Sequence, residues 1–259
     1  MMGPFSVSTN DEIGCLVDGF GTPPMVMMPH HRPYQGQLIE GAGLTKVKDL
    51  FAWRYVVGPL PPRAQKGYDQ IAALPEVSVR QVDKKHLSRD IEQVMAIFND
   101  AWSDNWGFVP FTQAEIDHAS KAFGPVIVPE LAVFVDVDDE SVAFIVALTN
   151  LYEAVEGFGG KLGPVNLAKL LWRLKIAGVG STRVPLMGVK KKFRNHPLLG
   201  AGLAMIAIDT LRANGKRLGK TSAELGWILE DNKATNNIIR SVGGVHYKTH
   251  RIYEKALAG

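Results

Sequence analysis

The chain has 259 residues and a formal net charge of only +3, and 46% of its residues are hydrophobic. The length suffices for one large domain or two modest ones, and the composition excludes a disordered chain. The weak charge makes nucleic acid an unlikely partner. Every apolar run is far shorter than the roughly 20 residues of a membrane span, and no signal peptide is recognisable, so we expect a cytoplasmic protein with no membrane partner. Cys15 stands alone, which excludes an intrachain disulfide.

The first 57 residues predict a short helix over Tyr34–Gly41 and a strand over Lys46–Val57. Residues 58–75 then concentrate proline and glycine. Pro59, Pro61 and Pro62 argue against a regular helix or a central strand there, so this stretch is interpreted as a linker or a segment that crosses between domains.

From residue 76 onward, strands and helices alternate with clear end signals. Thr112 and Glu115 are spaced as a capping box at the start of a helix. The acidic turn 138–141 separates two apolar runs and predicts an antiparallel hairpin. Such a mixture of strands and helices is typical of an α/β domain. We expect strands at 77–82, 131–137, 142–151, 184–189, 223–229 and 245–257, and helices at 86–106, 112–122, 166–176, 203–212 and 233–242.

Two segments share one layout and suggest an internal repeat. Gln37–Trp53 and Asn237–Tyr253 each contain a helix, a glycine at its end, a lysine-bearing turn and an aromatic-rich strand. Chance similarity stays an open alternative, because helix–glycine–strand is a common arrangement.

Ser181–Gly202 carries the most informative pattern. An apolar strand leads through basic residues, Lys190–Arg194, to Gly200-Ala201-Gly202 at the start of a helix. Backbone N–H groups at a glycine-lined helix start can bind a pyrophosphate, and the lysines could attract it. The alternatives are glycines that allow close packing and a basic turn that is merely solvated.

Three passages resemble the GNAT-type N-acyltransferase superfamily: Val142–Asn150, Met187–Gly202 and Glu224–Tyr253. The resemblance implies an α/β fold with a mixed, mostly antiparallel sheet flanked by helices. It covers a complete domain over residues 76–259, preceded by the linker 58–75 and a partial GNAT-like copy over 1–57. An exposed sheet edge on the partial copy would favour docking or a homodimer.

The resemblance also implies acetyl-CoA as co-substrate, held where two neighbouring strands separate so that the pantetheine pairs with backbone. A backbone N–H near Gly188 or Val189 would stabilise the oxyanion. For Gly188 a bulge or tight packing is the alternative, and for Asn232 it is a helix cap, with Asp231 as a rival. The cofactor-binding residues implied are Met187, Gly188, Val189, Leu199, Gly200, Ala201, Gly202 and Asn232.

Two departures from the family pattern bear on catalysis. Pro197 stands at the leading position of the pyrophosphate loop, and Ile239 stands where many members have a catalytic tyrosine. Glu224 and Glu230 are the candidates for a general base, because strand alternation places both on one face. Tyr247 and Tyr253 could replace the missing acid, or could be core residues; Trp102, Trp106, Phe108 and Phe111 could line an acceptor pocket, or form a core cluster.

These features predict transfer of an acetyl or other acyl group from acyl-CoA to a primary amine of a small molecule or peptide. No metal site is expected, because His30-His31, His246 and His250 lack a ligand cluster. Two alternatives stay open: a catalytically inactive binding or dimerisation module, and a related tandem transferase that takes its donor from aminoacyl-tRNA.

Overall fold

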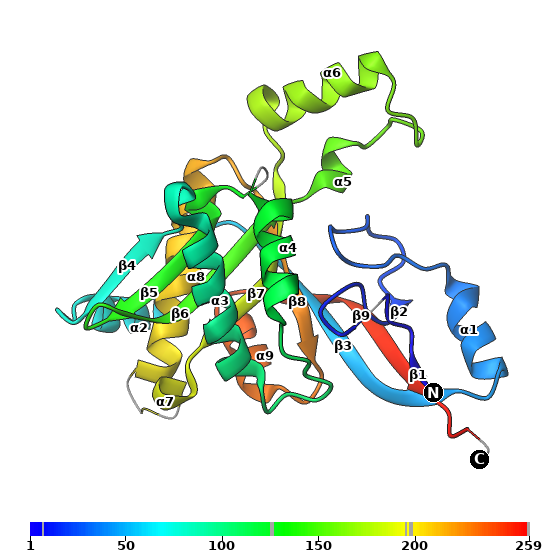
Figure 1. Cartoon of the computed structure of the whole chain (residues 1–259), viewed down its shortest axis with the longest axis horizontal. Helices are drawn as coiled ribbons and strands as arrows, with labels where there is room; N and C mark the ends of the chain where they lie inside the picture. Colours follow the sequence, from blue (N-terminus) through cyan, green and yellow to red (C-terminus); the bar gives the residue numbers. More distant parts are fainter. Residues whose placement is uncertain (7, 125–126, 195, 197–198, 258–259) are drawn as a thin grey trace.

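The computed structural model describes residues 1–6, 8–124, 127–194, 196 and 199–257. In this part of the chain one nine-stranded sheet has the order β1-β9-β3-β8-β7-β6-β5-β4, with β2 beside β9 (Figure 1). Only the β7–β8 pair is parallel, which confirms the expected mixed, mostly antiparallel sheet. The strands are β1 (Met2–Gly3), β2 (Cys15–Asp18), β3 (Thr45–Val56), β4 (Val77–Gln81), β5 (Ala132–Val137), β6 (Glu140–Thr149), β7 (Ser181–Val189), β8 (Ser222–Leu229) and β9 (Val245–Glu254).

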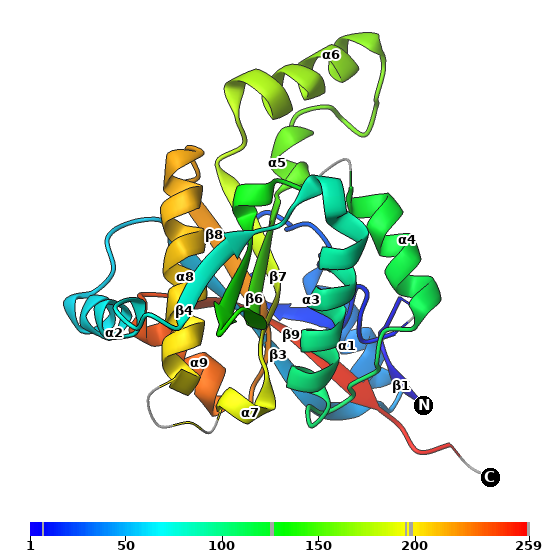
Figure 2. The same cartoon turned by 60° about the vertical axis from the view of Figure 1, so that its left-hand side comes forward.

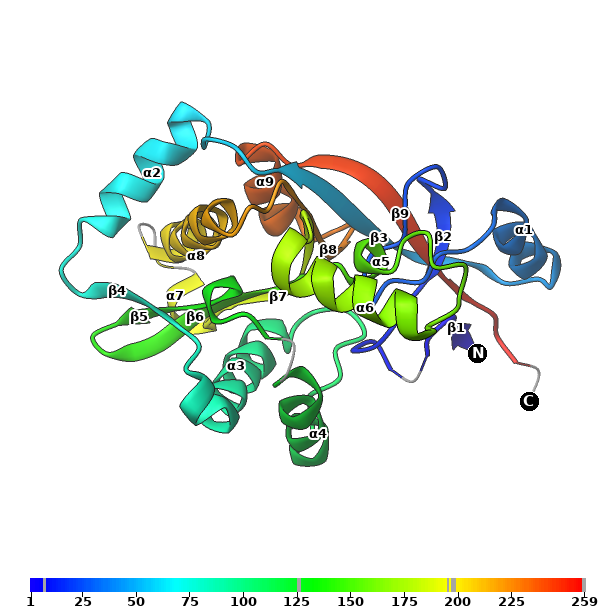
Figure 3. The same cartoon turned by 90° about the horizontal axis from the view of Figure 1, so that it is seen from above.

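Helices cover both faces of the sheet (Figures 2 and 3). One face carries α3 and α4, and the other carries α2, α8 and α9, so an apolar core lies on each side. In contrast, α5 and α6 project beyond the end of the sheet. The helices are α1 (Pro33–Gly41), α2 (Pro62–Ala72), α3 (Leu87–Trp102), α4 (Gln113–Phe123), α5 (Leu151–Ala154), α6 (Pro164–Trp172), α7 (Lys191–Arg194), α8 (Leu199–Arg217) and α9 (Lys233–Ser241).

Local end signals explain most element boundaries. Thr112 Oγ1 accepts from the Glu115 backbone N–H while the Glu115 carboxylate accepts from the Thr112 N–H, which is the predicted capping box of α4. Asp138 and Asp139 adopt positive φ angles of 50° and 63° in the tight turn between β5 and β6. Both aspartates tolerate this left-handed conformation, so the predicted hairpin is confirmed.

The expectation that the prolines rule out a regular helix within residues 58–75 was wrong, because α2 occupies 62–72. Pro61 is the N-cap and Pro62 the first helical residue, where a missing N–H costs no hydrogen bond. Ile71 anchors this helix in the core beside α8. The prolines therefore start a helix rather than prevent one.

The first 57 residues contribute to the same sheet, since β3 lies between β8 and β9. Strands β3 and β9 run antiparallel with Leu50 opposite His250, and the pairing is nearly symmetric about that point. Each strand follows a helix that ends at a positive-φ glycine, Gly43 or Gly243. Strand β2 pairs with β9 as β8 pairs with β3, so β2–α1–β3 and β8–α9–β9 are two copies of one unit.

Each copy is tied to the other by an aromatic side chain. Trp53 of β3 donates from Nε1 to Asn236 of α9, and Tyr253 of β9 donates to Glu40 of α1. The structure thus supports the predicted repeat. Strands from before and after residues 58–75 belong to the same sheet. The division into a partial and a complete domain therefore stays a prediction.

Candidate functional site

Strands β7 and β8 separate half-way along their length. Their parallel pairing runs from Ser181 opposite Ser222 to Val184 opposite Leu225 and then stops, although both strands are described to their ends. Beyond this point β7 stays paired with β6 and β8 stays paired with β3. We call the separated ends, 185–189 and 226–229, the fork. It is the strand separation that the sequence predicted for a thioester cofactor.

Two bulges and one proline explain why the strands part. Pro185 follows the last paired residue of β7 and has no N–H to continue the ladder. On the other side of β7, Val184 and Pro185 together oppose Ala147 of β6. Gly226, with a φ of +149°, belongs to a second bulge, in which two residues of β8 oppose Ala52 of β3. Bulges bend strands and increase their twist, so both strands turn away at the same level.

A buried ionic cluster lies at the closed end of the fork. Arg183 and Glu224 oppose each other in the ladder, with Arg183 Nε 3.4 Å from Glu224 Oε1, and both are almost fully buried. Lys248 Nζ lies 3.4 Å from Glu224 Oε2, and the Tyr247 hydroxyl donates to the same oxygen. Arg183 also donates to the Gly226 carbonyl at 2.9 Å, which joins β7 to the first separated residue of β8.

Burial changes the pKa values of the side chains in this cluster. It lowers the pKa of Arg183 to about 10 and lowers the pKa of Lys248, in both cases against the opposing effect of Glu224. Burial, followed by the charge of Glu224, raises the pKa of Tyr247 far above its ordinary value. Tyr247 therefore stays protonated, donates its hydrogen bond to Glu224 and is poorly suited to protonate a departing thiolate at neutral pH.

A cavity of about 530 Å³ opens beside the fork on the α3/α4 face. Ligand cavities typically have volumes of 300–1,000 Å³ and mostly apolar walls. Phe98 is central to its wall, with ring centroids 5.0 Å from Trp102, 5.9 Å from Phe108 and 5.3 Å from Phe111. Trp106 also lines it, so the four aromatic residues singled out in the sequence are cavity walls as well as packed neighbours.

Trp102 connects the cavity with the fork. Its indole Nε1 donates to the Met187 carbonyl of β7 at 3.0 Å. Its ring meets Trp227 of β8 edge-on, with centroids 5.6 Å apart. One side chain from the end of α3 therefore spans the two separated strands.

The residues predicted to bind the cofactor lie at the end of β7, at the start of α8 and at the N-cap of α9. Met187, Gly188 and Val189 form the stretch of β7 that has no β8 partner. Gly188 also has a packing reason, since a Cβ there would lie 2.9 Å from the Phe144 ring and 3.2 Å from Ala101. Tight packing against α3 thus explains this glycine, and its backbone stays free of β8.

The glycines at the start of α8 are packed as well. A Cβ on Gly200 would lie 2.3 Å from the Arg194 carbonyl oxygen, and one on Gly202 would lie 2.4 Å from Ile71 Cγ1. Ala201 between them is exposed, and Leu199 is half-buried against the core. Pro197 lies outside the described residues. The close helix packing weighed as an alternative is therefore present, and cofactor binding by this segment stays a prediction.

Asn232 caps α9, because its Oδ1 accepts from the Thr235 N–H at 3.1 Å. Its rival Asp231 instead pairs with Lys48 at 2.7 Å. Ile239 is buried in the core, and its hydrocarbon side chain has no proton to donate. The basic turn is ion-paired: Lys190 and Lys192 contact Glu140, and Lys191 contacts Asp104.

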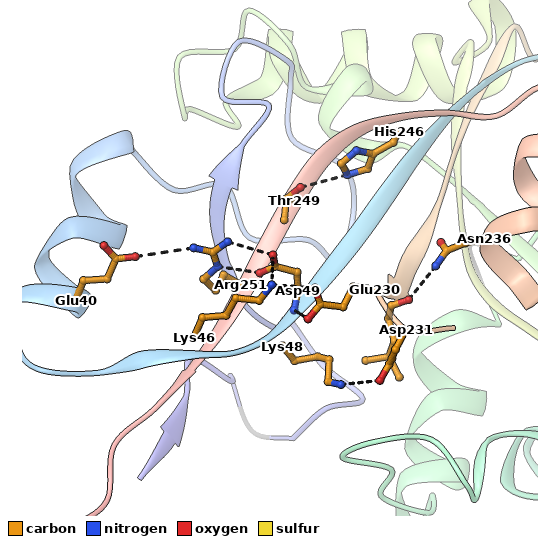
Figure 4. A network of polar contacts seen from close by, with 11 residues as sticks. Glu40, Lys46, Lys48, Asp49, Glu230, Asp231, Asn236, His246, Thr249 and Arg251 are labelled. Atoms are coloured by element: carbon orange, nitrogen blue, oxygen red, sulfur yellow. Dashed lines mark hydrogen bonds and ion pairs between the residues drawn. The ribbon is translucent and has the colours of Figure 1, made fainter. Parts of the chain in front are cut away.

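The two candidate bases do not share one face. The bulge at Gly226 interrupts the alternation from which that expectation came. Glu224 belongs to the buried cluster, whereas Glu230 accepts from Lys46 at 2.8 Å and from the Asp49 N–H at 3.0 Å (Figure 4). Arg251 of β9 donates to the Asp49 carboxylate of β3. Together with Glu230, Asp49 therefore links the β3–β9 pair to the end of β8. Both glutamates hold strands together, and a catalytic role for either stays a prediction.

Sequence reasoning missed three parts of the site: Arg183, Trp227 and the loop Thr9–Asp11, all of which line the cavity. From the sequence alone, an arginine in a strand is expected at the surface, so Arg183 gave no signal. Trp227 reaches the cavity because the bulge at Gly226 interrupts the strand alternation. Tyr253, proposed as a substitute acid, is buried near α1, and burial raises its pKa to about 12. Within the described ranges, no cluster of His, Cys, Asp and Glu is arranged to hold a metal ion, and no helix is long and apolar enough to cross a membrane.

Comparison with solved structures defines the class of fold. A GCN5-related N-acetyltransferase from Sphaerobacter thermophilus superposes with a TM-score of 0.53 at 14% identity, covering 89% of this chain and 57% of the other. The chain therefore has the GNAT-type fold that its motifs predicted. No protein-family model matches it.

Two curated proteins are similar along nearly the whole chain. A bacterial ceramide synthase from Caulobacter vibrioides is 45% identical over 258 residues, and protein YghO from Escherichia coli is 37% identical over 257 residues. These matches cover 99% and 98% of this chain but only 66% and 65% of the relatives. The chain thus spans slightly less than two thirds of their length.

Proposed function

We propose that this protein is an N-acyltransferase that moves a long acyl group from acyl-CoA to the primary amine of a long-chain amino alcohol. The observation that carries this proposal is the fork of β7 and β8 opening beside a large apolar cavity. The fork leaves backbone groups of Met187–Val189 without a β8 partner, and those that neither β6 nor Trp102 engages are suited to pairing with pantetheine. The cavity offers hydrocarbon chains an apolar environment.

The reaction needs few catalytic groups. The neutral amine attacks the thioester carbonyl carbon, a C–N bond forms, the C–S bond breaks and CoA leaves as a thiolate. One amine proton is lost in the process and one proton returns to the thiolate sulfur. A backbone N–H near Gly188 or Val189 would stabilise the oxyanion, as the resemblance implies.

The choice of long chains rests on the cavity and on one relative. That relative is a bacterial ceramide synthase, and a ceramide is the amide of a fatty acid and a long-chain amino alcohol. An acetyl group would leave most of a 530 Å³ apolar cavity unfilled. Each methylene that enters it contributes about 0.8 kcal/mol, which is roughly fourfold in kcat/KM until the cavity is full.

The test is a chain-length series from acetyl-CoA to palmitoyl-CoA, with sphinganine and with a short amino alcohol as acceptors. Thiol release and the amide product, identified by mass spectrometry, are measured for the full chain. We expect rates to climb with chain length. Ala114→Trp places an indole at the cavity wall from an exposed helix position, and should flatten that climb while leaving short substrates unaffected.

Gln113→Trp is the matched control, because Gln113 is exposed on the same helix and does not line the cavity. Equal rates for all acyl-CoA donors would contradict the proposed preference for long acyl chains. Turnover of acetyl-CoA alone with a short amine would instead support the acetyltransferase predicted from the sequence. A folded protein that binds no CoA ester would favour the non-catalytic module.

A further inference from the structure

Residues 151–178 form an arm that projects from the body between β6 and β7 (Figures 1 and 2). It consists of α5, a glycine-rich loop, α6 and a π-helical turn, Arg173–Ala177. Both ends are fixed at one point, since the Glu153 carboxylate accepts from the N–H groups of Gly180 and Ser181 at 2.8 Å each. The arm is therefore anchored to the sheet.

Two polar side chains of the arm form hydrogen bonds within it. Arg173 donates to the carbonyls of Ala154 and Glu156 at 2.9 and 2.8 Å, and Asn166 donates to the Lys161 carbonyl at 2.8 Å. These bonds hold α6 against its own connecting loop. No residue of α6 or of the π-helical turn is buried, so their apolar side chains gain little from packing.

The exposed apolar side chains of the arm are large. Ile176 is 75% exposed, Val165 68% and Trp172 54%. Water-soluble surfaces rarely gather this much apolar area unless it contacts something. Leu162, Leu167, Leu171 and Leu174 of the arm are exposed as well.

The charge of the arm indicates what it contacts. The start of the arm contains Glu153 and Glu156, but between Gly157 and Gly178 the chain has no Asp or Glu and carries four cationic residues, Lys161, Lys169, Arg173 and Lys175. Trp and Leu beside Lys and Arg on a short exposed helix are the features of a helix that lies in a membrane interface. An anionic bilayer complements both the positive charge and the apolar surface.

We propose that the arm docks the protein on an anionic lipid bilayer, with its leucines and Trp172 in the interfacial layer. The expectation of no membrane partner rested on spanning length, which an interfacial helix does not need. The arm starts just beyond Leu148, which lines the cavity. Docking would thus hold the cavity near lipid, although the proposal does not depend on the acyl-transfer reaction.

The experiment is flotation of the full chain with vesicles, in the absence of any CoA ester. Vesicles of phosphatidylcholine alone are compared with vesicles that contain equal parts phosphatidylglycerol. We expect binding to the anionic vesicles that weakens as salt rises. The charge variant Lys161→Gln/Lys169→Gln/Lys175→Gln should bind roughly a hundredfold more weakly, because each cation near the surface contributes about fivefold.

The apolar variant Val165→Ser/Trp172→Ser/Ile176→Ser should lose at least tenfold in affinity. Its matched control is Val56→Ser/Val245→Ser, since both valines are 65% exposed outside the arm, and this variant should bind like wild type. Circular dichroism shows that each variant is folded. Wild type that stays off anionic vesicles overturns the proposal, as does equal binding by the arm variants. Self-association that the apolar variant abolishes, without vesicle binding, would make the arm an interface between copies instead.

Discussion

Gly202 allows a direct test of whether packing or phosphate binding explains the glycines at the start of α8. The three atoms nearest to a Cβ at Gly202 all belong to Ile71 of α2: Cγ1 at 2.4 Å, Cδ1 at 2.8 Å and Cβ at 3.3 Å. Ile71 is buried, so it cannot swing into solvent. We therefore expect Gly202→Ala to lower the free energy of unfolding when Ile71 is present, and not to lower it when Ile71 is replaced by alanine.

The magnitudes follow from the two opposing effects. In a helix interior, alanine is favoured over glycine by up to about 1 kcal/mol. With Ile71 in place, overpacking costs about 1–3 kcal/mol and outweighs that gain. Ile71→Ala alone should cost about 2–5 kcal/mol, because it leaves a cavity. In that background the two closest contacts, with Cγ1 and Cδ1, are removed, so the overpacking cost should shrink and Gly202→Ala should become neutral or stabilising.

The assay is urea denaturation of the four proteins of this double-mutant cycle. We expect a coupling energy of about 1–3 kcal/mol, with the double variant more stable than the sum of the single effects. Gly215→Ala is the matched control within α8, because its Cβ would meet only Lys220 at 3.6 Å and should act alike in both backgrounds. Additive effects of Gly202→Ala and Ile71→Ala would refute the packing explanation. If the double variant is stable yet no longer binds CoA, Gly202 also serves the cofactor.

Two further predictions concern buried charges. Glu224→Gln should lower the free energy of unfolding by about 3–5 kcal/mol, because it leaves the buried Arg183 and Lys248 without their counter-ion, whereas Glu230→Gln should cost about 1 kcal/mol or less at its partly exposed site. Thermal or urea unfolding measures both, and a stable Glu224→Gln protein that has lost only its turnover would instead identify a catalytic base. Burial lowers the pKa of His250 to about 4, so the folded state binds fewer protons than the unfolded state between that pH and the ordinary value of 6.5. Stability should therefore fall by about 3 kcal/mol as pH drops from 6.5 to 4. His250→Gln, which can still donate to the Pro29 carbonyl, should lack this part of the loss; parallel pH profiles for the two proteins would contradict the explanation.

Signals that lie within a few residues of one another were sufficient to predict much of this molecule. The capping box at Thr112, the acidic hairpin turn and the Asn232 cap each bring together groups that are adjacent in the chain, so the sequence alone determined them. The resemblance of three passages then implied the GNAT-type fold, including the separation of the two strands. Pro62 misled because a proline acts differently at the first residue of a helix than within one.

Only the tertiary structure decided what the candidate site contains. The bulge at Gly226 turns Trp227 into the cavity, and its position depends on pairing with β3, which is more than 170 residues away in sequence. Arg183, Glu224 and Lys248 form a cluster because three strands bring them together, and no local pattern marks them. Periodicity describes one element at a time, whereas burial, ion pairing and cavity volume arise between elements. The sequence alone therefore determined most helices and strands, whereas their packing determined the chemistry of the site.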